Sequence, residues 1–172
     1  MDAVDGTINL WSGFTDHVAF CIALTYEGTP VLGVVNAAIR KEFYWAAQGM
    51  DAFCNEKQIH VSGVEDVNRV LMGIDSGKDN RIAHLPYLEK AYGPGGITCA
   101  MMTGCASVPL TLVGSGALHA YLATSLEPED MAASVAVIRE AGGLVTNLNA
   151  KPWSLEDPSI LAANPALHGK LV

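Results

Sequence analysis

The chain has 172 residues and a mass of 18.1 kDa, enough for one ordinary domain or for a large part of a layered enzyme. Half of its residues are hydrophobic, 16% are charged and the mean hydropathy is +0.26, which excludes a disordered or low-complexity chain. Ten Lys and Arg residues stand against 18 Asp and Glu residues, so the formal charge is −8, with no basic stripe. This balance argues against a nucleic-acid polymer as a partner.

The longest uninterrupted apolar run, from Val18 to Leu24, is too short to cross a bilayer. An acidic residue, Asp2, follows Met1 where a leader would carry basic and then apolar residues. We therefore expect no membrane span or export signal, and a cytoplasmic location. Four widely spaced cysteines form no C-x-x-C pair, which predicts reduced thiols and no zinc site.

The first part of the chain has the pattern of an antiparallel meander. Apolar, β-rich runs separated by turn residues predict strands at 17–26, 31–39 and 42–47. A loop is expected over 49–55, and a short strand over 58–61.

From residue 69 onward, short strands and helices alternate. Helices are expected at 80–92, at 105–113 and, most clearly, from Pro128 to the Gly142–Gly143 pair. A meander followed by βαβ-like alternation predicts an α/β (α+β layered) body with two layers of sheet. We expect two parts, 1–64 and 65–172. The strands predicted in the second part are 69–74, 97–102, 118–123, 144–148 and 159–163.

The string Asp2-Ala3-Val4-Asp5-Gly6-Thr7 can carry metal chemistry. Two carboxylates three residues apart, with a backbone carbonyl between them, offer hard oxygen ligands to divalent cations. The N–H groups of Gly6 and Thr7 can hold phosphate oxygens, and the Thr7 hydroxyl can orient an attacking water. The alternative interpretation is a plain loop, because Asp, Gly and Thr are common turn formers.

Two further segments have both a functional and a structural interpretation. Asp130, in the first turn of the helix that Pro128 begins, can act as a third metal ligand or can serve only as a helix cap. The small residues Gly104, Cys105 and Ala106 can leave room for a ligand hydroxyl at a helix start. Alternatively, they only let that helix pack closely on a sheet.

Several of these segments together resemble the inositol monophosphatase family of Mg²⁺-dependent, lithium-sensitive sugar and nucleotide phosphatases. The string that starts at Asp2 resembles the family's D-P-[IVL]-D-G-T-x-N-F signature, and residues 49–55 are similar to its G-x-G-A-F-x-N loop. Residues 129–133 resemble W-D-x-A-A, and residues 140–143 match E-A-G-G. The resemblance extends over essentially the whole chain, in order.

The resemblance implies a fold, a cofactor and a set of site residues. The implied fold is a sandwich of alternating helix and sheet layers, and the protein is usually a homodimer. The implied reaction is hydrolysis of a small phosphorylated alcohol by water that Mg²⁺ activates. Asp5 and Thr7 would be catalytic, and Gly6 and Thr7 would hold the phosphate. The implied metal ligands are Asp2, the Val4 carbonyl, Asp5 and Asp130, and the residues facing the alcohol portion are Gly104, Cys105 and Ala106.

Some positions differ from the family pattern. Ala3 replaces Pro, Glu129 replaces Trp, and Cys105 stands where Ser or Thr is usual. Ala123 falls where inositol-preferring members carry a substrate-contacting Glu, and Glu127 falls where they have His, which argues against inositol phosphate as the preferred substrate.

The family also has an upstream segment with a Glu-rich metal loop, whereas this chain begins one residue before Asp2. We therefore expect an N-terminally truncated family member. The alternative hypothesis is a non-catalytic relative that folds or dimerises without turnover, because the loss of metal ligands weakens a site.

Overall fold

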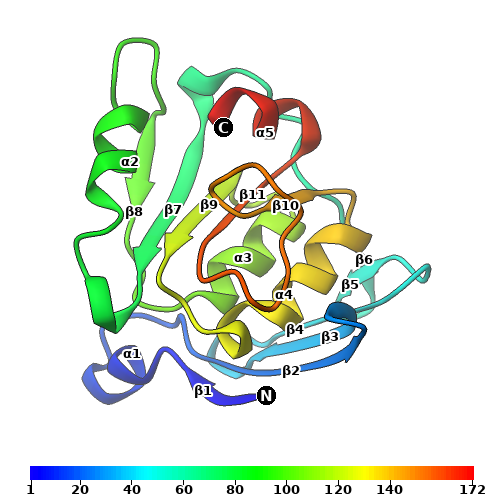
Figure 1. The fold of residues 1–172 in the computed structure, drawn as a ribbon. Helices are drawn as coiled ribbons and strands as arrows, with labels where there is room; N and C mark the ends of the chain where they lie inside the picture. Colours follow the sequence, from blue (N-terminus) through cyan, green and yellow to red (C-terminus); the bar gives the residue numbers. More distant parts are fainter.

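The computed structural model describes residues 1–172, which form two β-sheets with helices between and outside them (Figure 1). The first sheet is antiparallel and follows the chain order β1-β2-β3-β4-β5-β6. Its strands are β1 (Asp2–Asp5), β2 (Ala19–Tyr26), β3 (Thr29–Ala37), β4 (Glu42–Ala47), β5 (Ala52–Cys54) and β6 (Lys57–Gln58). The meander expected from the apolar runs is confirmed.

The second sheet has the order β10-β11-β9-β7-β8. In it, β7 pairs in parallel with both β8 and β9, and the other neighbours are antiparallel. This mixed pairing confirms the α/β expectation. The strands are β7 (Leu71–Ser76), β8 (Cys99–Met101), β9 (Ala120–Thr124), β10 (Leu144–Thr146) and β11 (Ile160–Ala163).

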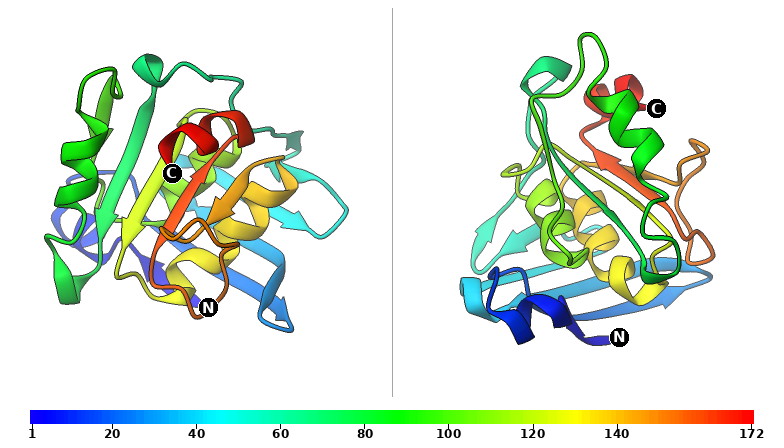
Figure 2. Two further views of the ribbon diagram at one scale, coloured as in Figure 1. Left: turned by 45° about the horizontal axis from the view of Figure 1, so that its top comes forward. Right: turned by 90° about the vertical axis from the view of Figure 1, so that its left-hand side faces the viewer.

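Five helices complete the layers: α1 (Thr7–Ser12), α2 (Leu85–Ala91), α3 (Ser107–Gly114), α4 (Pro128–Glu140) and α5 (Pro165–Leu171). The pair α3 and α4 lies between the two sheets, while α2 and α5 lie on the far side of the second sheet (Figure 2). The apolar residues of α4 therefore contribute to two cores. Met131, Val135 and Ile138 pack toward the second sheet, and Ala133 and Val137 pack toward the first.

Helix α4 packs directly on the backbone of strand β3. A Cβ atom at Gly33 would overlap the carbonyl oxygen of Ala133, so glycine on the strand and alanine on the helix permit this close contact. The capping residues that set the start of α4 agree with the sequence: Glu127 is the N-cap and Pro128 occupies the first turn. The first turn of α4, which carries Asp130, lies close to strand β1 of the first sheet.

Some local expectations were wrong. The segment 49–55 contains strand β5, and the strand expected at 58–61 is only the two-residue β6 at 57–58. The helix expected at 80–92 is shorter, because Pro86 sets its start, and a 3₁₀ turn (Lys78–Asn80) precedes it. Helices α1 and α5 were not predicted, since each is shorter than the periodic window that signals a helix. The division into 1–64 and 65–172 stays a prediction about folding units.

The outer face of the first sheet is apolar and solvent-accessible. Side chains alternate along β2, so that Cys21 points toward α4 whereas Ile22 and Leu24 point outward with 39% and 60% of their surface exposed. The stacked rings of Trp45 and Phe53 lie on the same outer face. None of the helices combines the length with the hydropathy that a membrane span requires.

Candidate metal and phosphate site

Asp2, Asp5 and Asp130 come together at one end of the first sheet. Strand β1 carries the first two, and the first turn of α4 carries the third. One carboxylate oxygen from each residue lies within 4.8 Å of the others. The ion pairs of the chain join other residues, so no Lys, Arg or His side chain neutralises this cluster. Three hard oxygen ligands without a cationic partner fit a divalent cation such as Mg²⁺.

Asp5 is fixed by the start of helix α3. Its Oδ2 accepts the N–H groups of Ala106 and Ser107 at 3.0 and 2.7 Å and the Ser107 hydroxyl at 2.6 Å. The Cys105 thiol also donates to this oxygen, at 3.1 Å. These donors occupy Oδ2 and stabilise its charge at the positive end of the helix, which leaves Oδ1 available as a ligand.

The ionised form of Asp130 is destabilised by burial and by neighbouring carboxylates. Burial, together with the negative charges of Asp5 and Asp2, raises its pKa from the ordinary 3.8 to about 6. The Glu127 N–H, which donates to Asp130 Oδ2 at 3.3 Å, opposes part of this shift. A bound cation would relieve the repulsion between the three carboxylates.

A cavity of about 610 Å³ opens in front of the three carboxylates. Every site residue predicted from the sequence lines it: Asp2, Val4, Asp5, Gly6, Thr7, Gly104, Cys105, Ala106 and Asp130. The tertiary structure thus brings together segments that lie far apart in the chain.

Gly6 allows β1 to turn into α1 beside the metal cluster. Its φ of +82° lies in the left-handed region, and a Cβ atom there would overlap the carbonyl oxygen of His17. Thr7 begins α1 and is exposed toward the cavity. Glycine is therefore required at this position by the positive φ and by the close packing of the turn against His17.

The α3 side of the cavity is mainly backbone. Cys105 is 3% exposed, burial raises the pKa of its thiol, and that thiol points to Asp5. The thiol thus holds the carboxylate, and of the three small residues that line this side of the cavity only Gly104 is exposed.

Several lining residues were missed at the sequence level. Lys78 and Arg81 are the only basic side chains of the cavity, and both follow β7. Asp75, at the carboxyl end of the same strand, is 6% exposed, and burial raises its pKa to about 6. The sequence contains one signal for Asp75: an acid directly follows the apolar run Leu71–Ile74. Such a position can indicate a ligand site, because ligand sites gather at the carboxyl ends of parallel strands.

The chain is similar to several characterised proteins. It is 34% identical over 167 residues to the Nus factor SuhB of Pseudomonas aeruginosa, covering 95% of this chain and 61% of that protein. It is 31% identical over 173 residues to an inositol-1-monophosphatase of Synechocystis, covering 99% and 60%. The crystal structure of the extragenic suppressor protein SuhB from Bartonella henselae matches 98% of this chain and 64% of its own, with 27% identity and a TM-score of 0.90.

The chain spans about half to two thirds of the length of the curated relatives it matches. The model of the inositol monophosphatase family matches residues 1–172, over the whole set of segments that form the fold and the carboxylate cluster. With the layered α/β fold, this match shows that the chain belongs to the inositol monophosphatase family.

Proposed function

We propose that the protein is a Mg²⁺-dependent hydrolase of a small phosphomonoester. The observation that carries this proposal is the convergence of three carboxylates without a cationic partner on a cavity that Gly6 and Thr7 also line. A phosphate dianion would be repelled by these acids alone, so a bound divalent cation must compensate their charge. Bound Mg²⁺ would polarise the phosphate and lower the pKa of a water molecule.

Each residue of the cluster has a distinct role in the proposal. Asp2, Asp5, Asp130 and the Val4 carbonyl hold the cation. The N–H groups of Gly6 and Thr7 orient the phosphate. The Thr7 hydroxyl orients the attacking water through a hydrogen bond. Asp5 is held by α3 before any ligand enters, which reduces the cost of organising the site.

The lining of the cavity favours a substrate other than inositol monophosphate. Ala123 is fully buried and does not reach the cavity, so this position offers no carboxylate to sugar hydroxyls. Glu127 lines the cavity on the same side, and Lys78 and Arg81 place two positive charges near its rim. These features support a phosphorylated alcohol that carries a further polar or anionic group.

The direct test is phosphate release from a panel of sugar, inositol, histidinol and nucleotide monophosphates, with Mg²⁺ and with EDTA. We expect turnover with Mg²⁺, no turnover with EDTA, and a loss of at least about 100-fold in Asp2→Asn, because a first ligand is removed. Asp2 is the better choice than Asp5, since Asp5 also holds α3. The matched control is Asp16→Asn, an exposed acid outside the cavity. A folded chain without Mg²⁺-dependent turnover would favour the non-catalytic alternative.

We also propose that the chain is a cytoplasmic homodimer. The apolar outer face of the first sheet supports self-association, because exposed apolar patches of this kind are typical of interaction surfaces. Light scattering should give a mass above 18.1 kDa that falls in the double variant Ile22→Lys, Leu24→Lys. The matched control is Ile82→Lys, at an exposed apolar residue outside the first sheet. A wild-type monomer at all concentrations would exclude the dimer.

A further inference from the structure

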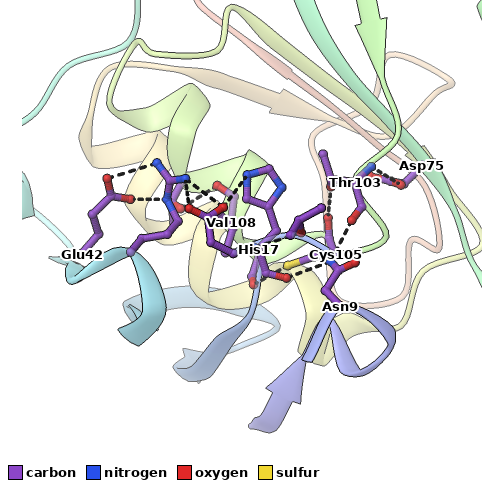
Figure 3. A network of polar contacts seen from close by, with 12 residues as sticks. Asn9, His17, Glu42, Asp75, Thr103, Cys105 and Val108 are labelled. Carbon is purple, nitrogen blue, oxygen red and sulfur yellow. Dashed lines mark hydrogen bonds and ion pairs between the residues drawn. The ribbon is translucent and has the colours of Figure 1, made fainter. Parts of the chain in front are cut away.

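The carboxylate of Asp75 has four hydrogen-bond donors and no cationic partner. Its Oδ1 accepts the N–H groups of Thr103 and Gly104 at 3.2 and 3.1 Å. Its Oδ2 accepts the Tyr121 hydroxyl at 3.2 Å, and it lies 3.3 Å from the Thr103 hydroxyl, whose one proton it shares with the Cys105 carbonyl oxygen at 2.9 Å. Figure 3 shows Asp75 beside Thr103, with Asn9 on the opposite side of the same turn. The carboxylate is thus joined to one turn at two consecutive amides.

The residues around Asp75 make room for a hydrogen-bond donor to this buried acid. Gly73 and Tyr121 are register partners on the parallel strands β7 and β9. A Cβ atom at Gly73 would lie 2.6 Å from the Tyr121 ring, so the missing side chain makes room for the ring to lie along β7. The fully buried Tyr121 therefore reaches Asp75 with its hydroxyl. A carboxylate at the end of an apolar strand is costly to bury unless such donors satisfy it.

The turn that Asp75 holds leads directly into the part of α3 that holds Asp5. Gly104 has a φ of +65° and lines the cavity, and the next three residues supply the donors to Asp5 Oδ2. Asn9 Nδ2 donates to the Thr103 carbonyl at 2.8 Å, which secures the turn from its other side. Two carboxylates and one amide side chain thus fix the segment 103–107 between them.

We propose that Asp75 is a positioning residue that fixes the Thr103–Gly104 turn, and through it the surface that contacts the alcohol portion of the substrate. Asp75 also lines the cavity, but all its hydrogen bonds go to protein donors. Its action is therefore on the shape of the site rather than on the phosphate. The part of the inference that concerns substrate rests on the proposed function, whereas the part that concerns the turn does not.

The experiment compares Asp75→Asn with Asp79→Asn in the full chain. Asp79 lines the same cavity and loses the same charge, but it is exposed and makes no side-chain hydrogen bond to the turn. Amide hydrogen exchange at Thr103 and Gly104 should be at least about tenfold faster in Asp75→Asn, since charge-assisted bonds are replaced by weaker ones. KM for the best phosphomonoester should rise about tenfold, with kcat within about threefold. Mg²⁺ affinity, measured by calorimetry, should change less than about threefold, because the metal ligands stay in place.

The outcomes separate this inference from the proposed function. If the chain releases no phosphate, the exchange rates alone decide whether Asp75 holds the turn. Unchanged exchange at both amides would overturn the inference. An equal KM increase in Asp79→Asn would also overturn it, because the loss of a negative charge in the cavity would then explain the effect. If Asp75→Asn does not fold, Thr103→Ala removes the hydroxyl that contacts both Asp75 Oδ2 and the Cys105 carbonyl oxygen within the turn, and it should raise KM by about threefold without a change in kcat. An unchanged KM in a folded, active Thr103→Ala would then contradict the inference.

Discussion

Asp130→Asn should abolish Mg²⁺-dependent phosphate release and at the same time make the folded chain more stable at pH 8. The first effect follows from the loss of a proposed ligand and should be at least about 100-fold. The second follows from the charge cluster, because Asn removes the repulsion with Asp5 and Asp2 while it keeps nearly the same shape. Since Asp130 is only half-buried, we expect a gain of roughly 1 kcal/mol, or about 2–4 °C in Tm.

The pH dependence of this effect has a defined sign. The pKa of Asp130 is about 6 in the folded chain and near the ordinary 3.8 in the unfolded chain. The folded state therefore binds the proton more tightly, and its stability falls as the pH rises from about 4 to about 6. The advantage of Asp130→Asn over the natural chain should appear across this window and persist above it. Asp75, whose pKa is raised in the same direction, contributes to the slope that remains in the variant.

Thermal unfolding from pH 4 to pH 8, with and without Mg²⁺, measures this prediction. Mg²⁺ should raise the Tm of the natural chain and leave that of Asp130→Asn unchanged, because only the natural chain has the complete cluster. Glu129→Gln is the matched control: it removes a carboxylate of the same helical turn that lies outside the three-residue cluster and repels Asp130 less than Asp5 and Asp2 do, so its stabilising effect should be the smaller. An Asn variant less stable than the natural chain at pH 8 would show that the bond from the Glu127 N–H outweighs the repulsion.

Gly6→Ala should cost about 3–5 kcal/mol of the free energy of unfolding, a large share of the stability of an ordinary domain. The substitution forces a side chain into the left-handed region and into the space of the His17 carbonyl oxygen, and the Cys105 Cβ is 3.3 Å away on another side. Because the overlap is with backbone, a rotamer change cannot relieve it.

Urea unfolding of Gly6→Ala beside Gly13→Ala separates conformational strain from overlap. Gly13 also has a positive φ, of +64°, but nothing lies within 4 Å of the added Cβ atom. Its substitution should therefore cost only about 1–2 kcal/mol, the strain of the left-handed conformation. Equal losses in the two variants would mean that the His17 segment moves aside and that the close contact at Gly6 contributes nothing.

Features that depend on local patterns can be predicted from the amino-acid sequence. Alternating apolar residues predict the strands of the first sheet, and Pro128 with Gly142–Gly143 delimits α4. The string from Asp2 to Thr7 contains both the carboxylates and the glycine that the β1–α1 turn requires. These signals are readable because each is set by residues a few positions apart.

How these parts meet depends on contacts between residues far apart in the chain, which the folded structure shows. The bonds from α3 to Asp5 join residues about a hundred positions apart, so no local pattern shows that one oxygen of Asp5 is already occupied. No local pattern shows the burial of Asp75 either. That burial depends on the missing side chain at Gly73, on the Tyr121 ring that uses this space, and on the turn at Thr103. Burial and hydrogen-bond partners are properties of the packed chain. For that reason the sequence predicts the ligands of the site, whereas the residues that hold the ligands in place appear only after folding.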